Sequence, residues 1–336
     1  MILTMKEAMF YKALNDGKVK CELCPHQCEI LPGKRGICRV RENREGTLFS
    51  LNYNRLIAAH VDPIEKKPLF HFYPGSQSYS IAAIGCNFHC LHCQNWTISQ
   101  VKGDVIKGEK VSPERVVQNT LDRDCLSISY TYTEPTIYYE TAYDISCLAH
   151  EKGLKNIFVT NGYISSEALK QLAPYLDAAN VDLKAMSEDF YRDVCGASLQ
   201  PVLDRIKQYY ELGIWIEVTT LIIPGYNDNA DELKQIAEFI TEIDKGIPWH
   251  VTAFYPTYKL NDVPPTPLSA LKIAYQIGKD AGLQYVYQGN VGHGENTYCP
   301  SCGKLVVKRD YFKIENKIEN DKCPFCGEKI KGIGMS

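Results

Sequence analysis

The chain has 336 residues, of which 45% are hydrophobic and 23% are charged, and its formal net charge is −3. This is an ordinary soluble composition, and the length predicts one large domain or a core with appendages. The slightly negative charge gives no reason to expect bulk binding to nucleic acid, although it leaves room for local basic patches. No run of about 18 apolar residues occurs, so no membrane span is expected. Residues 1–14 carry charges and lack an apolar stretch, which argues against a signal peptide.

The 14 cysteines are grouped, and the grouping is more informative than their number. Four lie between Cys21 and Cys38, three between Cys86 and Cys93, and four near the end of the chain. Gaps of two and three residues are typical of metal ligands in a reducing compartment and not of disulfides. The sequence therefore predicts a cytoplasmic metalloprotein. The scattered cysteines are Cys125, Cys147 and Cys195.

The first part of the chain, residues 1–78, is expected to be a metal-binding extension. It should begin with a short amphipathic helix at residues 4–15. Four thiols with glycines between them are typical of a closed four-thiolate site, and zinc is the expected metal because four ligands leave no open position. An auxiliary iron–sulfur cluster is the alternative. The four ligands are Cys21, Cys24, Cys28 and Cys38.

Strand is predicted for residues 47–60, and residues 62–68 read as a connector with a proline near each end. From residue 79 the pattern becomes a repeated strand followed by a helix. Apolar and β-branched runs predict buried parallel strands at residues 79–84, 126–132, 156–160, 178–183, 214–223 and 249–255. Helices are expected at residues 113–123, 136–152, 165–174, 188–212 (broken near Gly196), 230–243 and 267–281.

Six strand–helix units in series predict an α/β fold with a partial, open (β/α)6 barrel over residues 79–291, because closure would need eight units. Ser112-Pro113 and Gly153 are suitable caps for the first two helices. Chemistry in such barrels takes place at the carboxyl ends of the strands. Most of the candidate site residues fall at these strand ends.

The loop after the first of these strands contains three cysteines at the spacing C-x3-C-x2-C, namely Cys86, Cys90 and Cys93. Three thiolates suit a [4Fe–4S] cluster, and they leave one of its four irons without a protein ligand. A zinc knuckle with His89 or His92 as fourth ligand is the alternative.

This loop resembles the signature of the radical S-adenosylmethionine (SAM) superfamily, C-x3-C-x-φ-C, with His92 at the usually aromatic position φ. More of the chain resembles its pyruvate formate-lyase-activating-enzyme-like branch, and within that branch the radical SAM enzyme of the AmmeMemoRadiSam system. The resemblance extends over nearly the whole chain through these segments: Cys21–Cys38, residues 68–72, Cys86–Trp96, Tyr132-Thr133-Glu134-Pro135, Thr160-Asn161-Gly162, Asp182-Leu183-Lys184, Gly289-Asn290-Val291 and the terminal cysteine pairs.

The resemblance implies the same partial barrel, with the amine and carboxylate of SAM bound to the open iron. Glu134 then faces the amine, in a segment where the superfamily commonly has Gly-Gly-Glu-Pro, and Lys184 pairs with the SAM carboxylate, held by Asp182. We expect alanine at Glu134 or Lys184 to affect SAM binding more than folding. The alternatives are a solvated glutamate at a helix start and an internal ion pair. Val159 stands where related activating enzymes often have Asp, which puts their cation site in doubt.

Other SAM contacts follow from the same resemblance. Asn161 is expected to bond the ribose or carboxylate, and His250 the ribose, although a lone strand histidine is more often a core residue. Backbone near Gln288 and Asn290 is expected close to the adenine. The remaining expected cofactor-binding residues are His92, Tyr132, Thr133 and Thr160.

The tail, residues 292–336, carries two C-P-x-C-G knuckles that are typical of a zinc ribbon. Glycine after each second cysteine allows the turn that directs backbone amides at the thiolates. Such a ribbon could dock a partner or simply complete the fold. The four ligands are Cys299, Cys302, Cys323 and Cys326.

The sequence thus predicts an enzyme that reductively cleaves SAM to a 5′-deoxyadenosyl radical and removes hydrogen from a substrate that it does not identify. A reductant such as ferredoxin or flavodoxin is needed, and the resemblance implies Memo-like and AMMECR-domain partners. A glycyl radical enzyme activase is the alternative. A non-catalytic zinc-ribbon or iron–sulfur binding module, or an electron carrier, represents the other classes.

Overall fold

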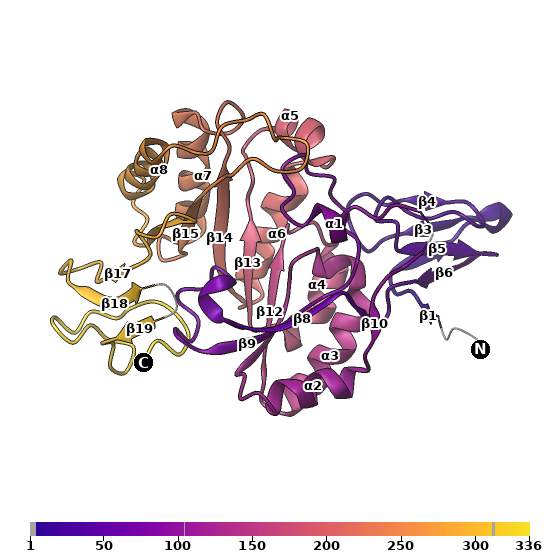
Figure 1. The fold of residues 1–336 in the computed structure, drawn as a ribbon, viewed down its shortest axis with the longest axis horizontal. Helices are drawn as coiled ribbons and strands as arrows, with labels where there is room; N and C mark the ends of the chain where they lie inside the picture. The colour runs from indigo at the N-terminus through magenta and orange to yellow at the C-terminus, as the bar shows by residue number, and fades with distance from the viewer. Residues whose placement is uncertain (1–4, 104, 311–312) are drawn as a thin grey trace. The chain divides into compact units, whose positions relative to one another are not determined.

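The computed structural model describes residues 5–103, 105–310 and 313–336. These residues form two compact units, one made of Met1–Asp62 and Gln77–Asp177, the other of Pro63–Ser76 and Ala178–Ser336. Each is a mixed α/β structure with parallel strands (Figure 1). No helix in the described part of the chain is long and apolar enough to cross a membrane.

Unit 1 contains three parallel strands in the order β9 (Gln77–Ala82), β11 (Ser127–Tyr130) and β12 (Lys155–Thr160), with β8 (Ala58–Pro63) beside β9. These strands are largely buried, and β9 and β11 bury four serines among their apolar residues, with Ser78 Oγ and Ser129 Oγ 2.6 Å apart. The helices of this part are α1 (Trp96–Ser99), α2 (Pro113–Leu121), α3 (Tyr139–Glu151) and α4 (Ser166–Leu172), with short 3₁₀ turns η3 (Pro135–Tyr138) and η4 (Ala173–Tyr175).

The N-terminal segment of unit 1 is made of small antiparallel sheets, drawn in indigo in Figure 1. One consists of β2 (Tyr11–Ala13), β3 (Val19–Cys21) and β4 (Glu29–Ile30), and a second of β1 (Lys6–Glu7), β6 (Thr47–Ser50) and β5 (Arg41–Arg44). The predicted helix at residues 4–15 is wrong over its described part, because strand pairing of Tyr11–Ala13 with β3 takes its place. The remaining elements are η1 (Asn15–Gly17), β7 (Arg55–Leu56) and β10 (Glu109–Lys110), which pairs with β7.

Unit 2 continues the alternation with four parallel strands in the order β13 (Ala178–Asp182), β14 (Trp215–Ile222), β15 (Trp249–Ala253) and β16 (Val286–Gly289). Helices α7 (Ala230–Ile243) and α8 (Leu268–Asp280) pack on each other, and α8 covers β15 and β16 (Figure 1). The other helices are η2 (Ile64–Lys66), α5 (Glu188–Phe190), a π-helical turn η5 (Tyr191–Cys195) and α6 (Gln200–Glu211).

The succession of strands and helices agrees with the predicted order, and the break near Gly196 is confirmed, with φ of 71° at that glycine. The cap at Ser112 is confirmed too, since its Oγ accepts a hydrogen bond from Arg115 N. Strand β16 was not among the predicted strands. Its four residues follow a helix and precede a turn, and so short a run carries little periodic signal.

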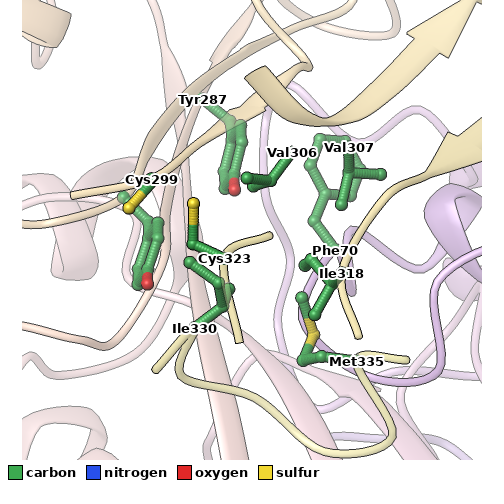
Figure 2. Close-up of a cluster of buried hydrophobic side chains, with 10 residues drawn as sticks. Phe70, Tyr287, Cys299, Val306, Val307, Ile318, Cys323, Ile330 and Met335 are labelled. Carbon is green, nitrogen blue, oxygen red and sulfur yellow. The ribbon is translucent and has the colours of Figure 1, made fainter. Parts of the chain in front are cut away.

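Beyond β16 the chain forms a three-stranded antiparallel sheet of β17 (Thr297–Tyr298), β18 (Leu305–Asp310) and β19 (Lys313–Asn316). A buried cluster joins this sheet to Phe70 and Tyr287, from the segment 63–76 and from β16 (Figure 2). Arg309 strengthens the same contact, donating a hydrogen bond to the Phe70 carbonyl. The terminal ribbon is therefore part of the core of unit 2.

Candidate metal centre and cofactor site

The three central cysteines lie in the loop between β9 and α1, at the carboxyl end of β9. Phe88 N donates to Cys86 Sγ at 3.3 Å, and Ser99 Oγ lies 3.1 Å from Cys93 Sγ. Burial, followed by the charge of Glu134, raises the pKa of Cys86 well above its usual value. A thiolate here therefore needs a nearby cation, and amides directed at sulfur are typical of iron–sulfur ligands. The residues fit the cluster predicted from the sequence.

The zinc-knuckle alternative for this loop has no support. Among the described residues, no group that includes Cys86, Cys90 or Cys93 brings three ligand atoms within 4.8 Å of one another, as one ion would require. His89 is exposed and its ring nitrogen hydrogen-bonds Gln100 Oε1 at 2.7 Å. His92 is buried within the loop.

Two asparagines fasten the cysteine loop to the end of β12. Asn161 Nδ2 donates to Asn87 Oδ1 at 2.8 Å and lies 3.9 Å from Cys86 Sγ, and Asn87 Nδ2 donates to the Tyr163 carbonyl. Asn161 also accepts from Tyr163 N, so its side chain is held at both ends. If Asn161 also contacts SAM, as predicted, one side chain must both position the cluster loop and bind the cofactor.

Glu134 is completely buried at the start of η3. Its Oε1 accepts from Thr136 N at 3.0 Å, Thr136 Oγ1 at 2.6 Å and Thr160 Oγ1 at 2.8 Å, and Oε2 accepts from Asn161 N at 2.8 Å. Burial raises the pKa of Glu134 and these donors oppose the shift. The solvated-glutamate interpretation is therefore wrong. Oε2, with one donor, has capacity for a second.

The two residues before Glu134 are also fixed by hydrogen bonds. Tyr132 has φ of 67°, and its carbonyl accepts from Asn95 Nδ2 at 2.7 Å while its hydroxyl donates to Asp62. Thr133 Oγ1 donates to the Ala83 carbonyl. Tyr132 thus has the left-handed backbone that glycine adopts without strain, and its two hydrogen bonds fix it there.

Lys184 and Asp182 lie at the end of β13 in unit 2, with Lys184 Nζ 2.7 Å from Asp182 Oδ2. The ion pair confirms the prediction, made from strand alternation, that these two side chains lie on the same side of the strand. Both side chains keep part of their surface exposed, 14% for Lys184 and 35% for Asp182. Asn227 Nδ2 donates to the Lys184 carbonyl and positions this strand end. Glu134 lies in the other unit, so the expected clamp of Glu134 and Lys184 stays a prediction.

His250 lies in a buried network. Its Nε2 is 2.6 Å from Glu217 Oε2, and its ring stacks on Tyr287. Glu217 also accepts from the backbone amides of Phe70 and His71, and although burial alone would raise its pKa, His250 and these donors lower it. This placement favours a core role for His250 over the ribose contact.

Two residues expected near the adenine lie at the end of β16 and directly after it, Gln288 and Asn290. The backbone of Asn290 has φ of 63°, and its Nδ2 donates to the Ala253 carbonyl at 3.0 Å. Gln288 is buried, and its Oε1 has no hydrogen-bond partner in the structure. A buried unpaired amide oxygen is costly, so this acceptor is available to a donor such as an exocyclic amine.

The N-terminal cysteines Cys21, Cys24, Cys28 and Cys38 line one cavity in unit 1, together with His26, Arg41 and Asn87. Arg41 is buried, forms an ion pair with Glu140, and its Nη1 lies 3.5 Å from Cys21 Sγ. Sequence reasoning missed Arg41, His26 and Asn87. Of these three, only Asn87 could have been found from the sequence, because it lies inside the cysteine loop.

The four terminal thiols converge in unit 2. The Sγ atoms of Cys299, Cys302, Cys323 and Cys326 all lie within 4.8 Å of one another. Gly303 and Gly327 have φ of 69° and 78°, and their amides donate to the carbonyls of the first cysteine in each knuckle. The predicted glycine turns are therefore present, and the two glycine amides themselves donate to carbonyl oxygens. The quartet could hold a metal ion.

Three thiols in a loop after the first of a run of parallel strand–helix units are the ligand set of an iron–sulfur protein with an α/β fold. Residues 81–240 match the profile of the Radical SAM superfamily, and the chain belongs to this superfamily of enzymes. It is similar to the uncharacterized protein MJ0808 of Methanocaldococcus jannaschii, with 52% identity over 332 residues, which cover 97% of this chain and 99% of that one.

Other similarities are more distant. The pyruvate formate-lyase-activating enzyme of Staphylococcus aureus is 21% identical over 218 residues, covering 59% of this chain and 87% of that enzyme. The crystal structure of Streptococcus suis SuiB bound to S-adenosylmethionine covers 68% of this chain and 53% of its own, with a TM-score of 0.52 and 14% identity. That likeness concerns the fold alone.

Proposed function

We propose that this protein reductively cleaves SAM at a [4Fe–4S] cluster held by Cys86, Cys90 and Cys93, and uses the resulting 5′-deoxyadenosyl radical to remove hydrogen from a substrate delivered with Memo-like and AMMECR-domain partners. The observation that carries the proposal is the three-thiol loop after β9, in which Phe88 N donates to Cys86 Sγ and Ser99 Oγ contacts Cys93 Sγ, while in the described residues no three ligand atoms of this loop gather as one ion would require. Ferredoxin or flavodoxin is the proposed reductant.

When bound, the cluster supplies one low-potential electron and an open iron for the amine and carboxylate of SAM. Asn87 and Asn161 hold the loop, and Phe88 N and Ser99 Oγ stabilise the charge on two of the sulfurs. The free lone pair of Glu134 Oε2 would accept from the SAM amine, and Lys184 would pair with the carboxylate. The unpaired Gln288 Oε1 would accept from the adenine amine.

The second candidate function is activation of a glycyl radical enzyme, in which the hydrogen is removed from a glycine of a partner polypeptide. The similarity to the S. aureus pyruvate formate-lyase-activating enzyme favours it. The two candidates share the cleavage of SAM and differ in the hydrogen donor. For the terminal quartet we propose zinc, because four thiols at this separation suit a tetrahedral structural ion.

The proposed function is tested by anaerobic reconstitution with iron and sulfide, followed by dithionite and SAM. The expected products are methionine and 5′-deoxyadenosine, absent when Cys86, Cys90 and Cys93 are all replaced by alanine. No cleavage by a parent protein with a full, reduced cluster would refute the enzyme proposal and favour a binding module.

The hydrogen donor is then tested by adding unlabelled SAM to partner proteins that carry deuterium on carbon. Deuterium appearing in 5′-deoxyadenosine with the Memo-like and AMMECR-domain proteins present would support the first candidate. A glycyl radical signal in electron paramagnetic resonance (EPR) on a glycyl radical enzyme would instead support the second.

A further inference from the structure

We infer that the four N-terminal cysteines hold a second [4Fe–4S] cluster, in place of the zinc ion predicted from their spacing. The two cysteine quartets of the chain have different geometries. In the described part of the chain, only the terminal quartet brings three or more ligand atoms within 4.8 Å of one another. Zinc–sulfur bonds of about 2.3 Å in a tetrahedron place sulfurs about 3.8 Å apart, so the N-terminal quartet is too open for one zinc ion.

The space that the N-terminal thiols enclose supports a polynuclear group. All four thiols line a single cavity, which also has Leu23, Ile30 and Ile37 in its wall. Four sulfurs drawn around a zinc ion would leave no such space between them. A cube of four irons and four sulfides needs it, and four protein thiolates can ligate all four irons.

The lining of this cavity is suited to an anionic cluster. It is largely apolar, with Leu23, Ile30 and Ile37 beside the thiols, and its one guanidinium, Arg41, is buried and directs Nη1 at Cys21 Sγ. As thiolates lining one largely apolar cavity, the four cysteines would repel one another. Iron at the centre removes that repulsion, as any metal centre would.

The cavity adjoins the loop that carries the SAM-binding cluster. Asn87, which follows Cys86, is part of the cavity wall, and its carbonyl lies 2.7 Å from His26 Nε2. Gly85, which precedes Cys86, packs so closely that a Cβ there would lie 3.1 Å from the Cys38 carbonyl oxygen and 2.9 Å from Val40 Cγ1. One layer of residues therefore separates the two sets of thiols.

The test uses the full-length protein, reconstituted anaerobically and analysed for iron, sulfide and zinc. One variant replaces Cys86, Cys90 and Cys93 by alanine, and a second replaces Cys21, Cys24, Cys28 and Cys38. The parent should hold about twice the iron of either variant, and all three proteins should keep the same zinc at the terminal quartet. The triple variant decides the question alone, because it leaves the N-terminal segment unchanged even if the quadruple variant fails to fold.

A spectroscopic arm separates this inference from the proposed function. Reduced with dithionite, the triple variant should give the EPR signal of a [4Fe–4S] cluster that SAM does not alter, since every iron has a protein ligand. A triple variant without iron that binds twice the zinc of the terminal quartet would overturn the inference and restore zinc. The outcome does not depend on whether the parent cleaves SAM.

Discussion

Glu134→Ala should destabilise unit 1 strongly, because the carboxylate is the common acceptor for four buried donors. The hydroxyls of Thr136 and Thr160 can rotate to other acceptors, but the amides of Thr136 and Asn161 cannot. Each buried donor left unpaired costs about 1–3 kcal/mol, so two amides cost about 2–6 kcal/mol. We expect a loss of about 4 kcal/mol, a large part of the 5–15 kcal/mol that roughly describes a whole protein.

Glu134→Gln is the matched control. Its amide oxygen can keep the three contacts of Oε1, and only the Asn161 amide then meets an NH₂ group in place of an acceptor. The expected loss is therefore about 1–3 kcal/mol. Both substitutions are made in the background lacking Cys86, Cys90 and Cys93, so that loss of a cluster does not contribute.

The assay is urea unfolding under anaerobic conditions, followed by far-ultraviolet circular dichroism. If the free energy of unfolding of Glu134→Ala is within about 1 kcal/mol of its parent's, the carboxylate does not stabilise unit 1 as its hydrogen bonds indicate. The expectation from sequence, that this variant would lose SAM binding more than stability, would then be restored. A loss shared equally by alanine and glutamine would instead show that charge, and not the number of acceptors, is decisive.

Three further predictions concern single residues. Lys184→Ala should weaken SAM binding to the reconstituted enzyme by about ten- to a hundredfold with little change in iron content, measured by anaerobic calorimetry; unchanged affinity would leave Lys184 as an internal ion pair. Burial lowers the pKa of His71 to about 4, so the fold holds it neutral. The free energy of unfolding should therefore fall by about 3 kcal/mol as pH falls from about 6.5 to about 4, because over this range only the unfolded chain binds the proton. Glu217, Arg309 and His250 surround His71, so the slope of unfolding free energy against pH is compared with that of His71→Asn, and equal slopes would contradict the assignment. Gly85→Ala, with φ of 110° and a Cβ 2.9 Å from Val40 Cγ1, should lower the free energy of unfolding by about 1–3 kcal/mol and reduce the iron bound at Cys86. Gly153→Ala is the control for backbone strain alone, because its φ is 75° and the space around its Cβ is open. Equal losses of iron in the two variants would show that the contact with Val40 is unimportant.

The sequence was informative wherever one local pattern determined the structure. Apolar and β-branched runs predicted strands such as residues 156–160, observed as Lys155–Thr160, and the spacing of Cys86, Cys90 and Cys93 predicted a three-thiol loop. The short N-terminal strands were mistaken for a helix, because Tyr11–Ala13 has strand structure only through pairing with β3. The strand propensity of a short segment does not indicate which distant strand will pair with it.

Long-range contacts account for the rest. Arg41 and Glu140 are ninety-nine positions apart, and nothing near either residue in the sequence indicates that they form a buried ion pair. The same holds for the asparagine pair, Asn87 and Asn161, which are seventy-four positions apart. The spacing of Cys21, Cys24, Cys28 and Cys38 indicated a metal site, but the separation of their sulfurs, which distinguishes one ion from a cluster, depends on the fold around them.

The joining of Phe70 to the ribbon has a consequence for the order in which the nascent chain can fold. The buried cluster that surrounds Phe70 and Tyr287 includes Ile330 and Met335, and Tyr73 N donates to the Ile333 carbonyl. The strands of unit 1 are complete once Asp177 has been synthesised, but the core of unit 2 must wait until residue 335 has left the ribosome. At about 5–20 residues per second this delay is roughly 10–30 s. During that time Phe70 lacks its partners, so a chain that stops before Ile330 would present this apolar surface to chaperones and proteases.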